Sequence, residues 1–147
     1  MTREEFIDIL DRKGYSYEIE GDKIIVTNEG TVYLGSLTSL PSGVEFKNVG
    51  NIFLDSLREL PSDVEFKNGG GVWLDSLTSL PPGLKFKNKE DVYLDSLTSL
   101  PPGVVFKNAD VQMGSLIGGW LNDWKGKIEG IDSKRLLNFM ISKGMFI

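Results

Sequence analysis

The chain has 147 residues, of which 40% are hydrophobic and 25% charged. This length suits a single domain, residues 1–147, with an ordinary core and without a separate catalytic domain. The formal net charge of -5 disfavours direct nucleic-acid binding, because duplex binders need Lys and Arg to neutralise phosphates. The same acidity could instead let the protein compete with nucleic acid for a basic groove on another protein.

The sequence contains neither cysteine nor histidine. The missing cysteines exclude disulfides and thiolate–metal sites, which fits a reducing compartment. The missing histidines remove the commonest general base and metal ligand. The opening segment carries acids, and no run of about 18 apolar residues occurs, so neither a signal peptide nor a membrane span is predicted. We expect a cytoplasmic protein that needs no cofactor and contacts no membrane.

Residues 2–13 have the pattern of a short amphipathic helix. Thr2 can cap its first turn, apolar residues recur every three to four positions, and Gly14 can end it. A strand over residues 15–19 would follow. Because a stack of parallel strands leaves unpaired edges at its ends, we interpret residues 1–21 as an N-terminal cap.

Four near-copies of a twenty-residue unit follow, beginning at Val32, Ile52, Val72 and Val92. A fixed period of this length is typical of a solenoid, in which each unit buries its apolar face by stacking on its neighbours. Each unit has two short stretches of alternating hydrophobicity, separated by a leucine-rich corner with a proline. We therefore predict two strands per unit, each parallel to the equivalent strand of the next unit and about 4.8 Å from it.

The periodicity extends beyond the four units. The residues just before them match the second half of a unit, and residues 111–116 match the start of another. The predicted solenoid spans residues 22–116. Residues 117–147 contain two amphipathic segments, one of them with Trp120 and Trp124, and predict a helical C-terminal cap. The predicted fold is mainly β: a parallel β-solenoid with helices at both ends.

Three columns of the repeat indicate how the chain turns. Two columns exchange Gly with Asp, namely Gly35, Asp55, Asp75 and Asp95 in the first and Gly43, Asp63, Gly83 and Gly103 in the second. Since Gly adopts positive φ without strain and Asp is among the better alternatives, both columns are predicted to bend through positive φ. The third column contains only asparagine and predicts an internal ladder that satisfies turn backbone groups: Asn48, Asn68, Asn88 and Asn108.

The run L-x-x-L-P-x-x-V-x-F-x-N, as at Leu57 to Asn68, resembles the short leucine-rich repeats of bacterial effector proteins. It departs from them in the place of its asparagine and in a second strand-like segment, which favours a two-sheeted β-solenoid over a horseshoe. The whole chain also resembles small repeat proteins of phages and prophages, through its TREEF opening and its IDSKRLLNFMISKG close. This resemblance implies a repeat fold and an accessory role. Some small acidic phage proteins block host defence enzymes.

One aromatic residue occupies the same position in each unit, and we call these four residues the aromatic strip: Tyr33, Phe53, Trp73 and Tyr93. The flanking Val and Leu are expected to point inward, so strand alternation sends the aromatic side chains outward. Four such side chains exceed the apolar patch that a monomer usually exposes, which indicates a partner-binding surface or a homodimer interface. Alternatively, the rings stabilise the ladder by stacking, lie under the C-terminal helix, or stack on sugars or bases.

Two columns of charged residues accompany the aromatic strip. The acidic row, which could extend the partner-binding surface, consists of Asp55, Asp75 and Asp95. A cation site there is disfavoured, because calcium-binding β-rolls have a denser Gly-Asp repeat. The lysine row lies on the opposite sheet, where Glu45 and Glu65 are expected to offset it: Lys47, Lys67, Lys87 and Lys107.

Catalysis has little support in the sequence. Its serines have no histidine partner, and the glycines at 69–71 are not followed by the lysine of a phosphate-binding loop. The leading hypothesis is a non-enzymatic protein-binding module that acts by steric occupation of a partner. The alternatives are an acidic inhibitor of a host nucleic-acid enzyme, of the anti-CRISPR or anti-restriction kind, and a carbohydrate-binding repeat protein.

Overall fold

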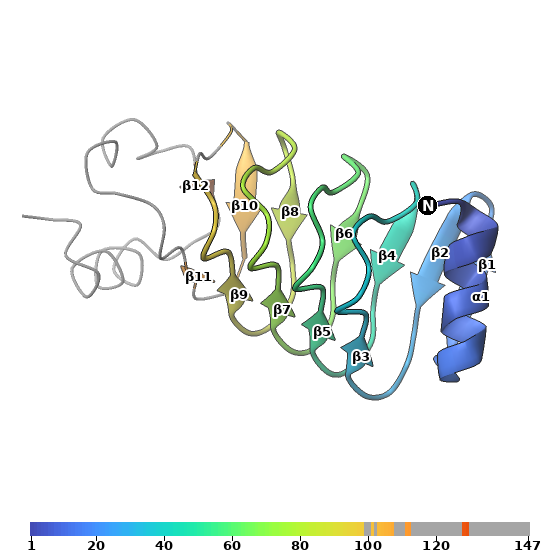
Figure 1. Ribbon diagram of the computed structural model, residues 1–147. Helices are drawn as coiled ribbons and strands as arrows, with labels where there is room; N and C mark the ends of the chain where they lie inside the picture. The colour runs from blue at the N-terminus through green and yellow to red at the C-terminus, as the bar shows by residue number, and fades with distance from the viewer. Residues whose placement is uncertain (99–100, 102, 108–110, 113–127, 130–147) are drawn as a thin grey trace, which may run out of the picture.

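The chain folds as a mainly β, parallel solenoid that begins with one helix (Figure 1). The computed structural model describes residues 1–98, 101, 103–107, 111–112 and 128–129. Within this part of the chain, no helix has the length and apolar character needed to cross a membrane.

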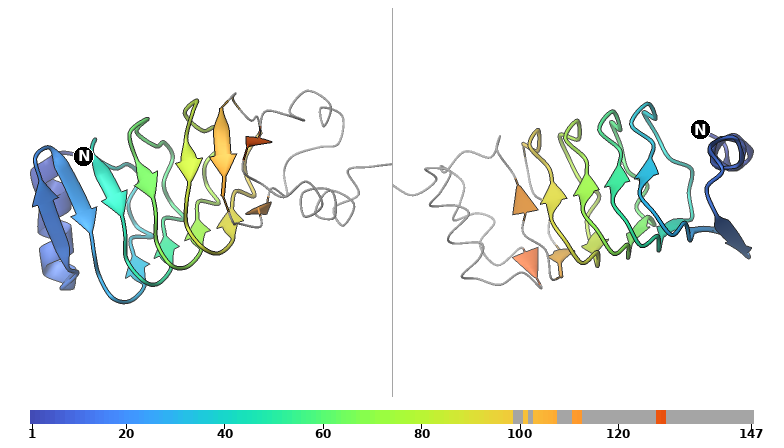
Figure 2. Two further views of the ribbon diagram at one scale, coloured as in Figure 1. Left: turned by 180° about the vertical axis from the view of Figure 1, so that it is seen from behind. Right: turned by 90° about the horizontal axis from the view of Figure 1, so that it is seen from below.

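Two sheets form the walls of the solenoid, and Figure 2 shows both rows of strands from behind and from below. The seven-stranded sheet contains, in spatial order, β1 (Tyr17–Glu20), β2 (Lys23–Val26), β4 (Val44–Phe46), β6 (Glu65–Phe66), β8 (Lys85–Phe86), β10 (Val104–Phe106) and β12 (Ile128–Glu129). The five-stranded sheet contains β11 (Val111–Gln112), β9 (Val92–Tyr93), β7 (Val72–Trp73), β5 (Ile52–Phe53) and β3 (Val32–Tyr33). The two-sheeted form agrees with the prediction from the repeat.

Equivalent residues of successive units lie opposite each other in both sheets. Ile52 pairs with Val32 on one side and with Val72 on the other. In the second sheet Phe66 pairs with Phe86. Twenty residues therefore complete one turn of the solenoid, as predicted.

The two partial units also belong to the solenoid. Strand β2 runs parallel to β4 with Ile24 opposite Val44, and β11 runs parallel to β9 with Val111 opposite Val92. Residues 113–116, which were predicted to continue the last unit, lie outside the described residues.

The interior contains one column of side chains for each inward position of the repeat. In the first full unit the buried Val, Leu and Phe residues are Val32, Leu34, Leu37, Leu40, Val44 and Phe46. Their phenylalanine column forms a continuous inner stack, with ring centroids 5.5, 5.3 and 5.0 Å apart along Phe46, Phe66, Phe86 and Phe106. Because one unit has only a thin core, this stacking joins the units into a single hydrophobic core.

The two Gly/Asp columns turn the chain in different ways. Positive φ values of 79°, 74° and 78° occur, as predicted, at Gly43, Gly83 and Gly103. The prediction was wrong for Gly35, which does not adopt positive φ. There the Leu37 N–H donates to the Leu34 carbonyl at 3.1 Å. A turn closed by such a bond can keep negative φ at both central residues, which any residue type can adopt.

The asparagine column forms the predicted internal ladder. Asn68 is fully buried, and its Nδ2 donates to the carbonyls of Gly50 and Gly70, both at 3.2 Å. Asn48 and Asn88 make the equivalent contacts to their own turns and to the preceding ones. The asparagine side chains therefore bind consecutive turns to each other. Asn108 lies outside the described residues.

The N-terminal cap consists of α1 (Arg3–Lys13) and β1, which pairs antiparallel with β2 (Figure 1). Thr2 caps the helix by accepting a hydrogen bond from the Glu5 N–H at 3.1 Å, and Gly14 ends it with φ 71°. Phe6 and Leu10 are completely buried against the first turn of the solenoid. The predicted helix and strand are both present, although the strand runs over residues 17–20 instead of 15–19.

The predicted C-terminal helices, including Trp120 and Trp124, lie outside the described residues. Within residues 117–147 the structure describes β12, which runs parallel to β10 with Ile128 opposite Val104. This strand was not predicted, because two residues are too few to show an alternating pattern.

Candidate functional site

The aromatic strip runs along the outer face of the five-stranded sheet. Strands β3, β5, β7 and β9 each contribute one of its members, because the preceding Val or Ile and the following Leu are buried. Neighbouring rings stack, with centroids 5.2, 4.4 and 4.4 Å apart and interplanar angles of 1°, 25° and 15° along Tyr33, Phe53, Trp73 and Tyr93. The four side chains that the sequence singled out are therefore in continuous contact.

Stacking determines which part of each ring faces solvent. Tyr33 is 58% exposed, whereas Phe53, Trp73 and Tyr93 are half-buried. Both faces of Phe53 and of Trp73 are covered by the neighbouring rings. The strip thus presents the edges of its inner rings as an apolar ridge. Stacking within the ladder was one of the alternatives raised by the sequence, and the structure shows it.

Gly71 makes room for the largest ring of the strip. It precedes Trp73 by two residues and so lies on the same face of the strand. A Cβ at Gly71 would come within 2.8 Å of the Trp73 ring, which indicates that the indole lies over this glycine. The other units have Thr31, Asn51 or Asp91 at this position. The sequence analysis missed Gly71. A signal was present, because one unit has both the only glycine of this column and the only tryptophan of the aromatic strip.

Carboxylates line the strip on both sides near its C-terminal end. The acidic row follows the aromatic residues by two positions, and Asp75 accepts a hydrogen bond from the Asp95 N–H at 3.3 Å. On the other side, the Tyr93 hydroxyl lies 3.5 Å from Asp91 Oδ2. Asp91 is a flanking acid that the sequence did not indicate, since its column varies from unit to unit.

Burial changes the acidity of these groups. Partial burial raises the pKa of Asp55 and of Asp75, and for Asp75 the negative charges of its neighbours in the row add to the effect. Burial and the nearby carboxylate of Asp91 also raise the pKa of Tyr93. The part of these shifts that comes from neighbouring carboxylates shows a negative surface beside Asp75 and Tyr93, which favours basic groups over anions.

The opposite sheet contains a network of ion pairs around a buried carboxylate. Glu45 is 3% exposed, and its Oε1 lies 2.8 Å from Lys67 Nζ and 3.6 Å from Lys47 Nζ. Lys67 also contacts Glu65 at 2.8 Å, which lowers the pKa of that carboxyl group. The two glutamates offset the first half of the lysine row, as the sequence predicted.

Among the described residues, no group of three or more His, Cys, Asp or Glu side chains could hold a metal ion. Comparisons with protein-family models, with curated proteins and with solved structures find no match. The function of the chain is therefore inferred from the geometry of its surfaces.

Proposed function

We propose that this protein is a non-enzymatic binding module whose rigid solenoid presents the aromatic strip and the acidic row to a protein partner. The observation that carries the proposal is the continuous ridge of four rings across four turns, with Tyr33 58% exposed. The module would act by steric occupation of the partner's surface. A ridge of ring edges fits an apolar groove, and the flanking carboxylates favour basic groups at its rim.

A protein partner is favoured over a carbohydrate by the orientation of the rings. Sugars bind aromatic side chains through the flat face of the ring, and stacked neighbours cover both faces of Phe53 and Trp73. Apolar contact with ring edges needs no free face. A carbohydrate-binding role therefore has the weaker support.

The acidic inhibitor of a host nucleic-acid enzyme is the second candidate. It is favoured by the alignment of carboxylates at the spacing of the turns, with Asp55 and Asp95 close enough to Asp75 for their charges to raise its pKa. Salt distinguishes the two candidates: binding through acidic mimicry weakens steeply with ionic strength, whereas apolar contact does not. Because of the resemblance to phage and prophage repeat proteins, we propose that either function would be an accessory role in a mobile element.

The test is a capture experiment with immobilised protein and its variants. Tyr33→Ala removes the most exposed ring, and Lys107→Ala is the control, an exposed lysine on the opposite sheet. Proteins retained by the parent and by Lys107→Ala, but lost with Tyr33→Ala, are then purified and their affinities measured. If Tyr33 anchors the partner, Tyr33→Ala is expected to lose about 2 kcal/mol of binding free energy. Equal capture by all three proteins would exclude the strip as the binding surface.

Trp73→Ala removes a central ring of the aromatic strip, but it changes stability as well as binding. Trp73 stacks on two rings, and each aromatic pair contributes about 0.5–1.5 kcal/mol beyond its buried area. For Trp73→Ala, both the affinity for the partner and the free energy of unfolding must therefore be measured. Sedimentation of the parent and of Tyr33→Ala shows in addition whether the partner is a second copy of the chain.

A further inference from the structure

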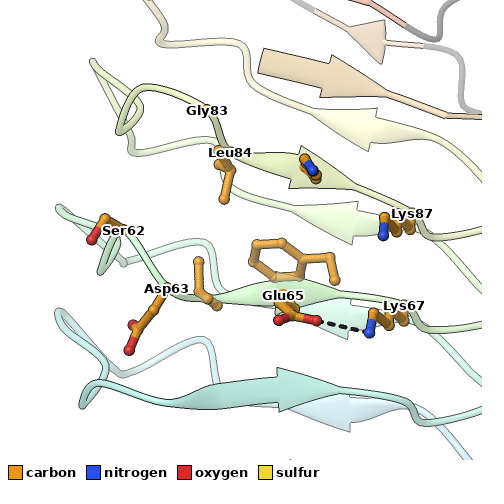
Figure 3. A pocket seen from close by; sticks show the side chains of 10 residues that line it. Ser62, Asp63, Glu65, Lys67, Gly83, Leu84 and Lys87 are labelled. Carbon is orange, nitrogen blue, oxygen red and sulfur yellow. Dashed lines mark ion pairs between the residues drawn. The ribbon is translucent and has the colours of Figure 1, made fainter. Parts of the chain in front are cut away.

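The outer face of the seven-stranded sheet contains a hollow of about 270 Å³ between β6 and β8 (Figure 3). Its lining includes Ser62, Asp63, Gly83, Lys85 and Lys87. This hollow lies on the side of the solenoid opposite the aromatic strip, so it is separate from the surface proposed above.

The turn before the hollow shows what the repeat can bind at this position. Asp63 Oδ2 accepts hydrogen bonds from the Ser42 hydroxyl at 2.6 Å and from the Gly43 N–H at 2.9 Å. The hydrogen bond from Ser42 is the main cause of the lowered pKa of Asp63. In Figure 3 the Asp63 carboxylate points away from Gly83, toward the preceding turn. A carboxylate from one unit thus binds the turn of the unit before it.

One unit later, the same arrangement lacks its carboxylate. Ser62 and Asp63 occupy the repeat positions of Ser42 and Gly43, but the residue that should supply the carboxylate is Gly83. A Cβ at Gly83 would meet no atom within 4 Å. Within the described residues, the Ser62 hydroxyl forms no hydrogen bond. Successive units are related by a shift of about 4.8 Å. The carboxylate that would bind Ser62 as Asp63 binds Ser42 would therefore lie between Ser62 and Gly83, which both line the hollow.

The charges around the hollow favour the binding of an anion. Lys85 stands at the repeat position of Glu65, and within the part of the chain that is described neither Lys85 nor Lys87 forms an ion pair. The two lining acids are already bound: Asp63 by the preceding turn and by its own N–H, and Glu65 by Lys67 at 2.8 Å. The unpaired charges at the hollow are therefore positive.

We propose that this hollow binds a carboxylate, with the Ser62 hydroxyl as hydrogen-bond donor and Lys85 and Lys87 as the countercharges. The position is specific to one turn, because the next unit has Pro82 in place of the serine. The carboxylate can come from a small free acid or from an acidic side chain of another protein.

The test is a titration of the amide spectrum of the full chain with sodium acetate, at constant ionic strength set by chloride. Saturable shifts at Ser62, Asp63 and Gly83 are expected. Ser62→Ala should weaken acetate binding roughly tenfold, the effect of one hydrogen bond to a charged group. Ser62→Thr keeps the hydroxyl and should keep the affinity, and Ser79→Ala is the control for loss of an exposed hydroxyl elsewhere.

Gly83→Asp supplies the carboxylate from within the chain and should abolish acetate binding. Because Gly83 has a φ of 74°, some loss of stability is expected, and unchanged aromatic-strip resonances show that the variant is folded. A glutamate-rich peptide titrated in the same way separates the two sources: tighter binding than acetate assigns the site to protein side chains, and equal binding assigns it to small acids. The proposal is overturned if neither ligand gives saturable shifts at the hollow, or if Ser62→Ala binds acetate as the parent does.

Discussion

The hydroxyl of Tyr15 accepts a hydrogen bond from the backbone N–H of Tyr33 at 2.9 Å. Tyr33 lies in β3, the edge strand of the five-stranded sheet, so among the described strands none pairs with this N–H. An open strand edge is a template for pairing with another chain. The N-terminal cap therefore protects this edge with one side chain, while β1 and β2 extend the other sheet.

Tyr15→Phe keeps the ring and removes this acceptor. We expect a loss of about 1 kcal/mol in the free energy of unfolding and faster hydrogen exchange at the Tyr33 amide. Exchange followed by NMR measures the local effect, and light scattering shows whether self-association increases. Tyr17→Phe is the control, since its hydroxyl donates only to the exposed Asp11. Unchanged protection of the Tyr33 amide would rule out this role of the hydroxyl.

Gly71→Ala should destabilise the protein by about 1–3 kcal/mol, because the added Cβ would lie 2.8 Å from the Trp73 ring. Gly35→Ala is the matched control: its Cβ meets no atom within 4 Å and its φ is not positive, so a neutral or slightly stabilising effect is expected. Urea denaturation compares the two. In a Trp73→Phe background, Gly71→Ala should lower the free energy of unfolding by less. An equal loss in both backgrounds would show that the clash is not with the Trp73 ring.

Lys67→Met should lower the free energy of unfolding by about 2 kcal/mol, because the buried Glu45 carboxylate loses its nearest cation. Lys87→Met removes a lysine from the same row that forms no ion pair within the described part of the chain. Its effect should stay within about 0.5 kcal/mol. Similar losses in both variants would show that the Glu45 contact contributes little.

Asp75 and Asp63 should affect stability with opposite dependence on pH. Burial raises the pKa of Asp75, so its ionised form opposes folding, and stability is gained as the pH falls through the folded pKa. Asp75→Asn should therefore raise Tm at pH 7, with the difference vanishing near pH 3.

The hydrogen bond from Ser42 lowers the pKa of Asp63. The ionised Asp63 therefore stabilises the fold above about pH 4, and this contribution is lost below it. Asp63→Asn should lower Tm at pH 7.

Scanning calorimetry from pH 3 to 7 measures both differences against the parent protein. Each variant serves as the control for the other, because both replace one carboxyl group by an amide at turns of two successive units. Differences of the same sign at pH 7 would contradict the assignment of opposite pKa shifts.

Much of the fold could be predicted because the repeat is regular. Inward columns such as that of Phe46 and Phe66, and the positive φ of Gly43, follow from alternation and from backbone sterics within one unit. The positive φ assigned to Gly35 was wrong, since a Gly/Asp exchange is also compatible with a turn closed by Leu34 and Leu37. Composition alone does not separate these two kinds of turn.

The sequence by itself determined the period, the inward columns and the outward position of the aromatic strip, because these depend on alternation along a single strand. Only the tertiary structure decided that Trp73 lies over Gly71, that Glu45 is buried among lysines, and that Ser62 lacks the carboxylate that Ser42 has. These features depend on contacts between one turn and the next. Their geometry is set by the register and spacing of stacked strands, which no single unit contains.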